Sequence, residues 1–143
     1  MSVGDLVAGM SPRLRPGRHL FCRLPDDATE HADRAAVPAR AVVTVAEDEG
    51  RTVVVPDDAV PEGALVDYPC AWITLEVHSS LDAVGFLAAV TTALAGAGLS
   101  VNPVSGFHHD HLFVPWDRRE EAMDVLRELA RCAQPRGGGS EGS

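Results

Sequence analysis

Three of the six histidines and an aspartate stand together in the stretch GFHHDHLFVP, residues 106–115. Imidazole and carboxylate groups ligate transition metals and transfer protons, so this stretch is the first candidate for chemistry. On an extended strand, however, His109 and His111 point to one face, and His108 and Asp110 point to the other. All four can converge on one ion only if they form the turn itself, and no Glu or Cys cluster supplies further ligands. We therefore predict no metal site here.

The same residues have a second interpretation as the turn of a hairpin. Phe107 and Leu112 flank four polar residues, and Asp is a favoured turn residue. We expect residues 107–112 to join two adjacent strands, with Asp110 in the turn. Contact with a ligand or a partner protein stays open as a secondary role of the histidines. Its candidate residues are His108, His109 and His111.

The stretch HSSLDAVG, residues 78–85, offers a different chemistry. It combines the imidazole of His78 and the hydroxyls of Ser79 and Ser80 with the backbone N–H groups of a predicted helix start. Such N–H groups bind carboxylates, and Asp82 can pair with an α-amino group. These groups suit a zwitterionic amino acid. The alternative is a capped helix with a surface histidine, because Ser79 and Asp82 also have the spacing of a capping box.

Covalent catalysis finds no support in the sequence. The G-x-S-x-G motif of a nucleophilic serine is absent, and AGAG at residues 95–98 follows a helix, so it reads as a helix stop and not as a phosphate loop. Cys22, Cys70 and Cys132 are widely spaced and form no C-x-x-C pair, which is typical of idle thiols in a reducing compartment. No catalytic residue and no cofactor is predicted.

The composition limits the classes of function. A chain of 143 residues fits one domain, and its 45% apolar but only 5% aromatic content predicts an aliphatic core. The net charge of −9, without a basic cluster, argues against nucleic acid as a partner. No signal peptide is recognisable, and no apolar run reaches the ~18 residues of a membrane span. We expect a soluble, cytoplasmic protein with no membrane partner.

The second half of the chain predicts the order β-α-β-β-α over residues 69–133. Strands are expected over residues 72–78, 100–107 and 111–116, a first helix over 84–95, and a second helix on the apolar stripe Ala122, Val125, Leu126, Leu129 and Ala133. Asp117 and Glu120 repeat the capping-box spacing. Residues 134–143 are Gly- and Ser-rich and are expected to be a disordered tail.

The first half, residues 1–68, is predicted to be rich in strands and to share the sheet of the second half. Strands are expected over residues 18–24, 39–46 and 51–56, with a surface loop over 25–38 and a short helix over 4–10. The second half lacks the final strand of a β-α-β-β-α-β unit, which would leave a sheet edge exposed. We therefore expect one continuous antiparallel sheet, with a strand from residues 18–55 beside residues 72–78 and with helices on one face.

The stretch WITLEVHSSLDAVGFLAAVTTALAGAGLSVNPVSG resembles the first half of an ACT domain, the small-molecule sensing module of amino-acid metabolism. Gly85 matches the glycine at the helix entry, Leu94 the apolar position in the helix, and GLSVN the usual GINI stretch. Over residues 10–133 the chain also resembles small bacterial ACT-like proteins of largely unassigned function. The shared features are the start PG…FC (Pro16, Gly17, Phe21 and Cys22), the W-I-T-L-x-V-H-S-S-L strand and the HHDHLFVP hairpin.

This resemblance implies an α+β, ferredoxin-like fold of the ACT type, with the missing last strand replaced by strands from the N-terminal half. It also implies a non-enzymatic regulatory module that binds an amino acid, as a homodimer that shares the site between two copies. The expected ligand-binding residues are His78, Ser79, Ser80, Asp82, Val84, Gly85 and Asn102. Two alternatives stay open: a protein-interaction module without a small ligand, and a small metal-dependent enzyme that uses the histidine-rich hairpin.

Overall fold

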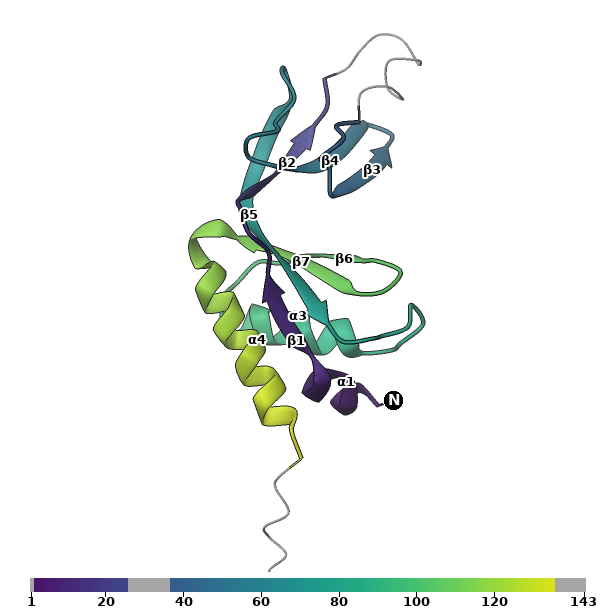
Figure 1. The fold of residues 1–143 in the computed structure, drawn as a ribbon, viewed down its shortest axis with the longest axis vertical. Coiled ribbons are helices and arrows are strands. Elements are labelled where there is room, and N and C mark those ends of the chain that lie inside the picture. The colour runs from purple at the N-terminus through teal and green to yellow at the C-terminus, as the bar shows by residue number, and fades with distance from the viewer. Residues whose placement is uncertain (1, 26–36, 136–143) are drawn as a thin grey trace, which may run out of the picture.

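A computed structural model describes residues 2–25 and 37–135 of the chain. The strands are β1 (Ser11–Leu14), β2 (His19–Arg23), β3 (Val43–Glu47), β4 (Gly50–Pro56), β5 (Leu65–Glu76), β6 (Asn102–Ser105) and β7 (Asp110–Pro115). The helices are α1 (Val3–Gly9), α3 (Phe86–Gly96) and α4 (Arg119–Ala133), and a 3-10 turn over Trp116–Arg118 precedes α4 (Figure 1). Residues 26–36 of the expected surface loop and 136–143 of the expected tail lie outside the described residues.

The strands form a single antiparallel sheet in the order β3-β4-β2-β5-β7-β6, and β1 also pairs with β5. The long strand β5 connects the two halves of the chain. Its first part pairs with β2, and its second part pairs with β7 on one side and with β1 on the other. The prediction of an antiparallel sheet that continues across both halves is confirmed.

One predicted strand pairing is wrong. We expected a strand from residues 18–55 beside residues 72–78, but that edge is paired with β1, in which Ser11 lies opposite Glu76 and Leu14 opposite Ile73. The strand β2 pairs further back along β5, from Leu65 to Cys70. The sequence of β1, SPRL, is short, polar and contains a proline, so it shows no alternating apolar pattern. A proline is tolerated there because β1 pairs on one side only.

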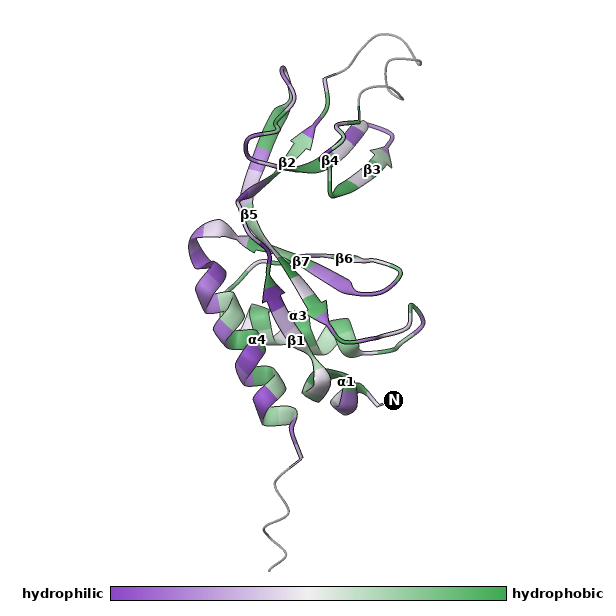
Figure 2. Cartoon of the chain, in the orientation of Figure 1, coloured by the Kyte–Doolittle hydropathy of each residue, from purple (hydrophilic) through white to green (hydrophobic). Residues whose placement is uncertain are grey.

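The helices cover one face of the sheet, as predicted. The main core joins Leu6 and Val7 of α1, Val90 of α3 and Leu126 of α4 to apolar side chains of β5 and β7 such as Ile73. Each fully buried side chain of this size contributes roughly 1.5–3 kcal/mol to stability. Figure 2 shows hydrophilic and hydrophobic residues together on α4, as expected for a helix that rests on a core. None of the described helices is long and apolar enough to cross a membrane.

The helix starts differ from those predicted. Neither α3 nor α4 has a side-chain cap, because α3 begins after Gly85 and α4 begins after Arg118. The capping boxes expected from Ser79–Asp82 and from Asp117–Glu120 are therefore absent. The short helix α1 does have a capping box, in which the Ser2 hydroxyl accepts from the backbone N–H of Asp5.

Candidate functional site

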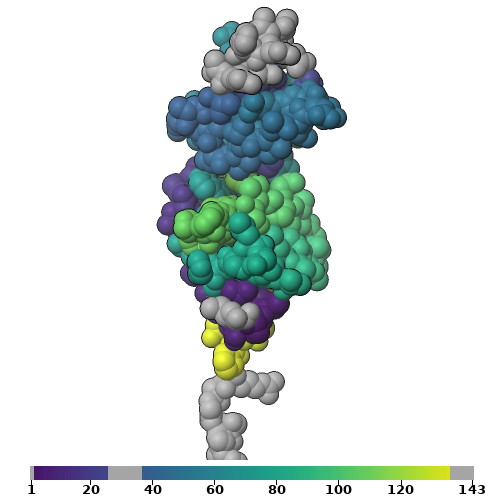
Figure 3. All heavy atoms as spheres, turned by 90° about the vertical axis from the view of Figure 1, so that its right-hand side faces the viewer, coloured from purple at the N-terminus to yellow at the C-terminus, as the bar shows by residue number. Residues whose placement is uncertain are grey.

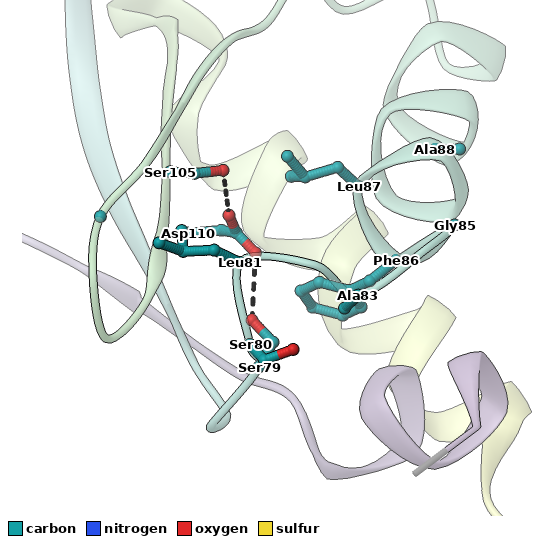
Figure 4. A pocket seen from close by; sticks show the side chains of 11 residues that line it. Ser79, Ser80, Leu81, Ala83, Gly85, Phe86, Leu87, Ala88, Ser105 and Asp110 are labelled. Atoms are coloured by element: carbon teal, nitrogen blue, oxygen red, sulfur yellow. Dashed lines mark hydrogen bonds between the residues drawn. The ribbon is translucent and has the colours of Figure 1, made fainter.

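A pocket of about 120 Å³ lies where the loop between β5 and α3 meets the first turn of α3 and the hairpin between β6 and β7 (Figure 4). In the space-filling view the green hairpin and the teal loop lie next to each other on one face of the molecule (Figure 3). The fold thus brings the two stretches with candidate chemistry together. The pocket is lined by Ser79, Ser80, Leu81, Ala83, Gly85, Phe86, Leu87, Ala88, Ser105, Gly106 and Asp110.

Asp110 supplies the carboxylate of this pocket, and its side chain is only 8% exposed. One carboxylate oxygen, Oδ1, accepts a hydrogen bond from the Ser105 hydroxyl at 2.6 Å. The other, Oδ2, accepts a hydrogen bond from the Ser79 hydroxyl at 3.3 Å. Figure 4 shows both bonds, with Ser79 and Ser105 on either side of the carboxylate.

The prediction that Asp110 lies in the turn is wrong. Asp110 is the first residue of β7, where it pairs with Ser105 of β6 and with Leu75 of β5. The turn itself is closed by the backbone N–H of Gly106, which donates to the carbonyl oxygen of His109 at 2.8 Å. Because side chains alternate along a strand, Asp110 points to the helix-covered face and into the pocket.

The buried carboxylate of Asp110 forms no ion pair with any residue in the described part of the chain; its hydrogen bonds there come from two neutral hydroxyls. The sequence contains no lysine, and the described residues that line the pocket include no arginine. Burying a carboxylate without an opposite charge is costly, even when hydroxyls bind it. A positively charged group of a ligand would offset this cost.

The first turn of α3 supplies hydrogen-bond donors to the same pocket. Its first backbone bond is donated by Ala89 to the carbonyl oxygen of Gly85, at 3.0 Å. The preceding N–H groups, those of Phe86, Leu87 and Ala88, have no partner in the helix ladder, and no side chain caps them. All three residues line the pocket. Such N–H groups, together with the positive end of the helix dipole, favour a carboxylate.

The structure brings only part of the predicted site together. Ser79, Ser80 and Gly85 line the pocket. His78, Asp82 and Val84 belong to the same loop and are exposed, and Asp82 accepts a hydrogen bond from Ser80 at 2.6 Å. Eight lining residues were not predicted as ligand contacts: Leu81, Ala83, Phe86, Leu87, Ala88, Ser105, Gly106 and Asp110.

Asn102 and Gly85 have surroundings that were not expected. Asn102 pairs with Phe113 on β7, so its side chain belongs to the sheet face opposite the helices. Gly85 has a φ of +95°, and an added Cβ would lie 3.2 Å from Val3 of α1. A side chain at this position would therefore strain the backbone and crowd Val3 of α1.

The three histidines of the hairpin do not converge. His111 lies on the open face of the sheet, where its Nδ1 accepts a hydrogen bond from the indole N–H of Trp72 at 3.0 Å. Burial lowers the pKa of His111 below its ordinary value, and the nearby Arg15 and His109 lower it further. His108 is exposed and packs against the ring of Phe107. Among the described residues, no group of three His, Cys, Asp or Glu side chains is placed to hold a metal ion. The absence of a bound metal stays a prediction.

Comparison with known proteins decides the family. Two ACT domain models match consecutive parts of the chain, residues 1–71 and 67–128. The crystal structure of VC0802 from Vibrio cholerae, a protein of unknown function described as a possible transport protein, is 34% identical. The alignment covers 90% of this chain and 96% of VC0802, with a TM-score of 0.74. The chain belongs to the ACT domain family.

Other ACT-like structures share the fold at lower identity. Atu0741 from Agrobacterium tumefaciens is 24% identical over 85% of this chain and 89% of its own, with a TM-score of 0.68. The ligand-free regulatory subunit of aspartate kinase from Thermus thermophilus is 12% identical over 82% of this chain and 95% of its own, with a TM-score of 0.59. These two structures support the fold alone. No curated protein matches the chain.

Proposed function

We propose that this ACT domain protein binds a free amino acid in the pocket between the β5–α3 loop and the β6–β7 hairpin, as a non-enzymatic regulatory module. Its fold is that of regulatory ACT modules, which typically bind small ligands such as amino acids. An α-amino acid requires an acceptor for its ammonium group and donors for its carboxylate, and the pocket holds both. Asp110 lies on one side of the pocket, and the start of α3 lies on the other.

The ammonium group of the ligand is assigned to Asp110. The sequence suggested Asp82 for this role, but Asp82 is exposed and does not line the pocket, whereas Asp110 is buried there. An ammonium donates to a carboxylate through short, charge-assisted hydrogen bonds, which are stronger than those of the two hydroxyls. The buried carboxylate without an ion pair in the described chain is the observation that carries the proposal.

The carboxylate of the ligand is assigned to the N–H groups of Phe86, Leu87 and Ala88. These donors belong to the backbone, so they recognise the group that all amino acids share and leave the side chain free to decide specificity. The helix begins after Gly85, and no side-chain cap hydrogen bond occupies these donors. An amine without a carboxylate, or a carboxylic acid without an amine, would lose one half of the recognition.

A melting-temperature screen of the twenty amino acids at millimolar concentration tests this function. At least one should raise the melting temperature, since a ligand selective for the folded state adds about 2.7 kcal/mol at a hundredfold excess over its Kd. Asp110→Asn should abolish the shift, and the surface variant Asp124→Asn should retain it. Asp82→Ala decides between the two aspartates, because it should also retain the shift.

If no amino acid shifts melting, the sensing function is wrong and a protein-interaction module becomes the better account. The predicted homodimer would extend the proposal, because a second copy at the exposed β5–α3 loop would close the pocket. Sedimentation equilibrium with and without the amino acid found in the screen measures this directly. A dimer that tightens with ligand supports a shared site, and a monomer in both samples contradicts it.

A further inference from the structure

Exposed apolar side chains from two segments belong to the pocket lining or stand next to lining residues in the chain. In the β5–α3 loop, Leu81 is 66% exposed and Val84 is 86% exposed, and Phe107 at the tip of the hairpin is 80% exposed. Leu81 itself lines the pocket, Val84 stands between two lining residues, and Phe107 follows the lining residue Gly106. Exposed apolar side chains close to a pocket mark binding surfaces more often than isolated ones do. We define Leu81, Val84 and Phe107 as the apolar rim.

The charge of the pocket restricts the ligand further. Within residues 2–25 and 37–135, Asp110 is the only charged residue that lines it. A ligand with an acidic side chain would place a second negative charge close to this carboxylate, where two like charges repel each other strongly. A basic side chain would lose water at the apolar rim, while Asp110 would already be paired with the ammonium group of the ligand.

The size of the pocket determines which part of an amino acid fits inside it and which part lies outside. Its volume of about 120 Å³ is several times what one water molecule requires, which suits the compact ammonium, carboxylate and α-carbon of an amino acid. With this head group between Asp110 and the start of α3, a side chain longer than a few atoms must leave through the mouth. There it meets the apolar rim.

We propose that the ligand is an amino acid with an uncharged, apolar side chain, aliphatic or aromatic, which packs against Leu81, Val84 and Phe107. This inference rests on the proposed function, and it adds the class of amino acid. When the complex forms, the side chain of the ligand displaces water from the apolar rim. The affinity therefore depends on the apolar area of that side chain, while Asp110 and α3 recognise the head group.

Isothermal titration calorimetry with leucine, phenylalanine, glycine, glutamate and lysine tests the inference. Glycine has the same head group without a side chain, so leucine and phenylalanine should bind at least about tenfold more tightly than glycine. Leu81→Ser should weaken leucine about tenfold and leave glycine unchanged. Leu65→Ser is the matched control, because Leu65 is 65% exposed and lies at the far end of β5.

The outcomes separate this inference from the proposed function. Glutamate, lysine or glycine binding as tightly as leucine, with loss of binding in Asp110→Asn, would overturn the apolar class and leave amino-acid binding in place. Equal loss of leucine affinity in Leu81→Ser and Leu65→Ser would also overturn it, because the rim would then have no specific role. If neither leucine nor phenylalanine binds, the apolar class fails, and the melting screen of the twenty amino acids still decides whether the site binds an amino acid at all.

Discussion

Ser105 and Asp110 face each other across the β6–β7 hairpin, and the Ser105 hydroxyl donates a 2.6 Å hydrogen bond to Oδ1 of Asp110. The next residue, His111, points to the opposite face and accepts a hydrogen bond from the indole of Trp72. One hairpin thus supplies a carboxylate to the pocket beneath the helices and an imidazole to the open face of the sheet. Because side chains alternate along β7, the carboxylate of Asp110 and the imidazole of His111 lie on opposite faces of the sheet although the two residues are neighbours in the sequence.

Ser105→Ala should destabilise the folded protein, because it removes the shorter of the two hydrogen bonds to the buried Asp110 carboxylate. We expect a loss of about 1–3 kcal/mol in the free energy of unfolding, measured by urea denaturation at neutral pH. Ser79→Ala removes the longer bond, at 3.3 Å, and should cost less. Equal stability of Ser105→Ala and the wild type would contradict the view that this carboxylate depends on its hydroxyl partners.

Gly85→Ala and Gly96→Ala form a matched pair at the two ends of α3. Gly85 has a φ of +95°, and a new methyl group would meet Val3 at 3.2 Å, so Gly85→Ala should cost about 1–3 kcal/mol. Gly96 is the last residue of the helix, and an added Cβ would meet nothing within 4 Å. Gly96→Ala should therefore be neutral or stabilising by up to about 1 kcal/mol. Thermal unfolding of both variants checks this, and a harmless Gly85→Ala would refute the assigned role of its backbone.

Stability should fall as the pH drops from about 7 to about 5.5. Burial lowers the pKa of His19 below the ordinary 6.5, and burial likewise lowers the pKa of His111. In this range the unfolded chain binds more protons than the folded chain, so lowering the pH favours unfolding. The contribution of the two neutral histidines to stability is fully present only above their ordinary pKa. His19→Phe keeps an aromatic ring against Trp72 and removes one of the two groups. Its urea midpoint should depend less on pH, and an unchanged slope would contradict the assignment.

A fragment of residues 69–133 should not fold on its own. It would lack β1 and β2, the neighbours of β5 on one side, and also Leu6, Val7 and Met10, which belong to the main core. The exposed edge of β5 would pair with other chains. We expect an insoluble product or one without a cooperative melting transition in circular dichroism. A soluble fragment that melts cooperatively would show that the N-terminal half is dispensable for the fold.

Sequence patterns predicted those elements whose periodicity is strong. The alternation around Ile73 and Leu75 located the second part of β5, which begins at Leu65 and not at residue 72 as predicted, and the apolar stripe through Ala122 and Leu126 located α4. The strand β1 was missed because SPRL shows neither pattern and is held in place by its partner strand. The role of Asp110 was missed for another reason. Alternation along the strand already placed the Asp110 side chain on the face opposite to His109 and His111. Its polar character nevertheless favoured a place in the turn. Only the pairing with the neighbouring strands shows which face of the hairpin lies under the helices.

The predicted ligand site overlaps the pocket in the β5–α3 loop and shares Ser79, Ser80 and Gly85 with its lining, and ligand binding there stays a prediction. Ser79 and Ser80 could be found because they follow a strand and precede a helix, the place where backbone N–H groups are free. Ser105 and Asp110 come from a hairpin more than twenty residues away, and only the three-dimensional fold places them beside Ser79. Asn102 was assigned to the site from its position on a neighbouring strand, without knowledge of the register that points it to the other face.

The central claim is that the pocket holds the head group of an amino acid between Asp110 and the first turn of α3. A titration of ¹⁵N-labelled protein with the amino acid that raises the melting temperature most in the screen, followed by amide chemical shifts, tests it most directly. We predict that the largest shifts occur at the backbone N–H groups of Phe86, Leu87 and Ala88, saturate with that amino acid, and vanish in Asp110→Asn. No saturable shift, or shifts confined to the open face around Trp72 and Asn102, would contradict it.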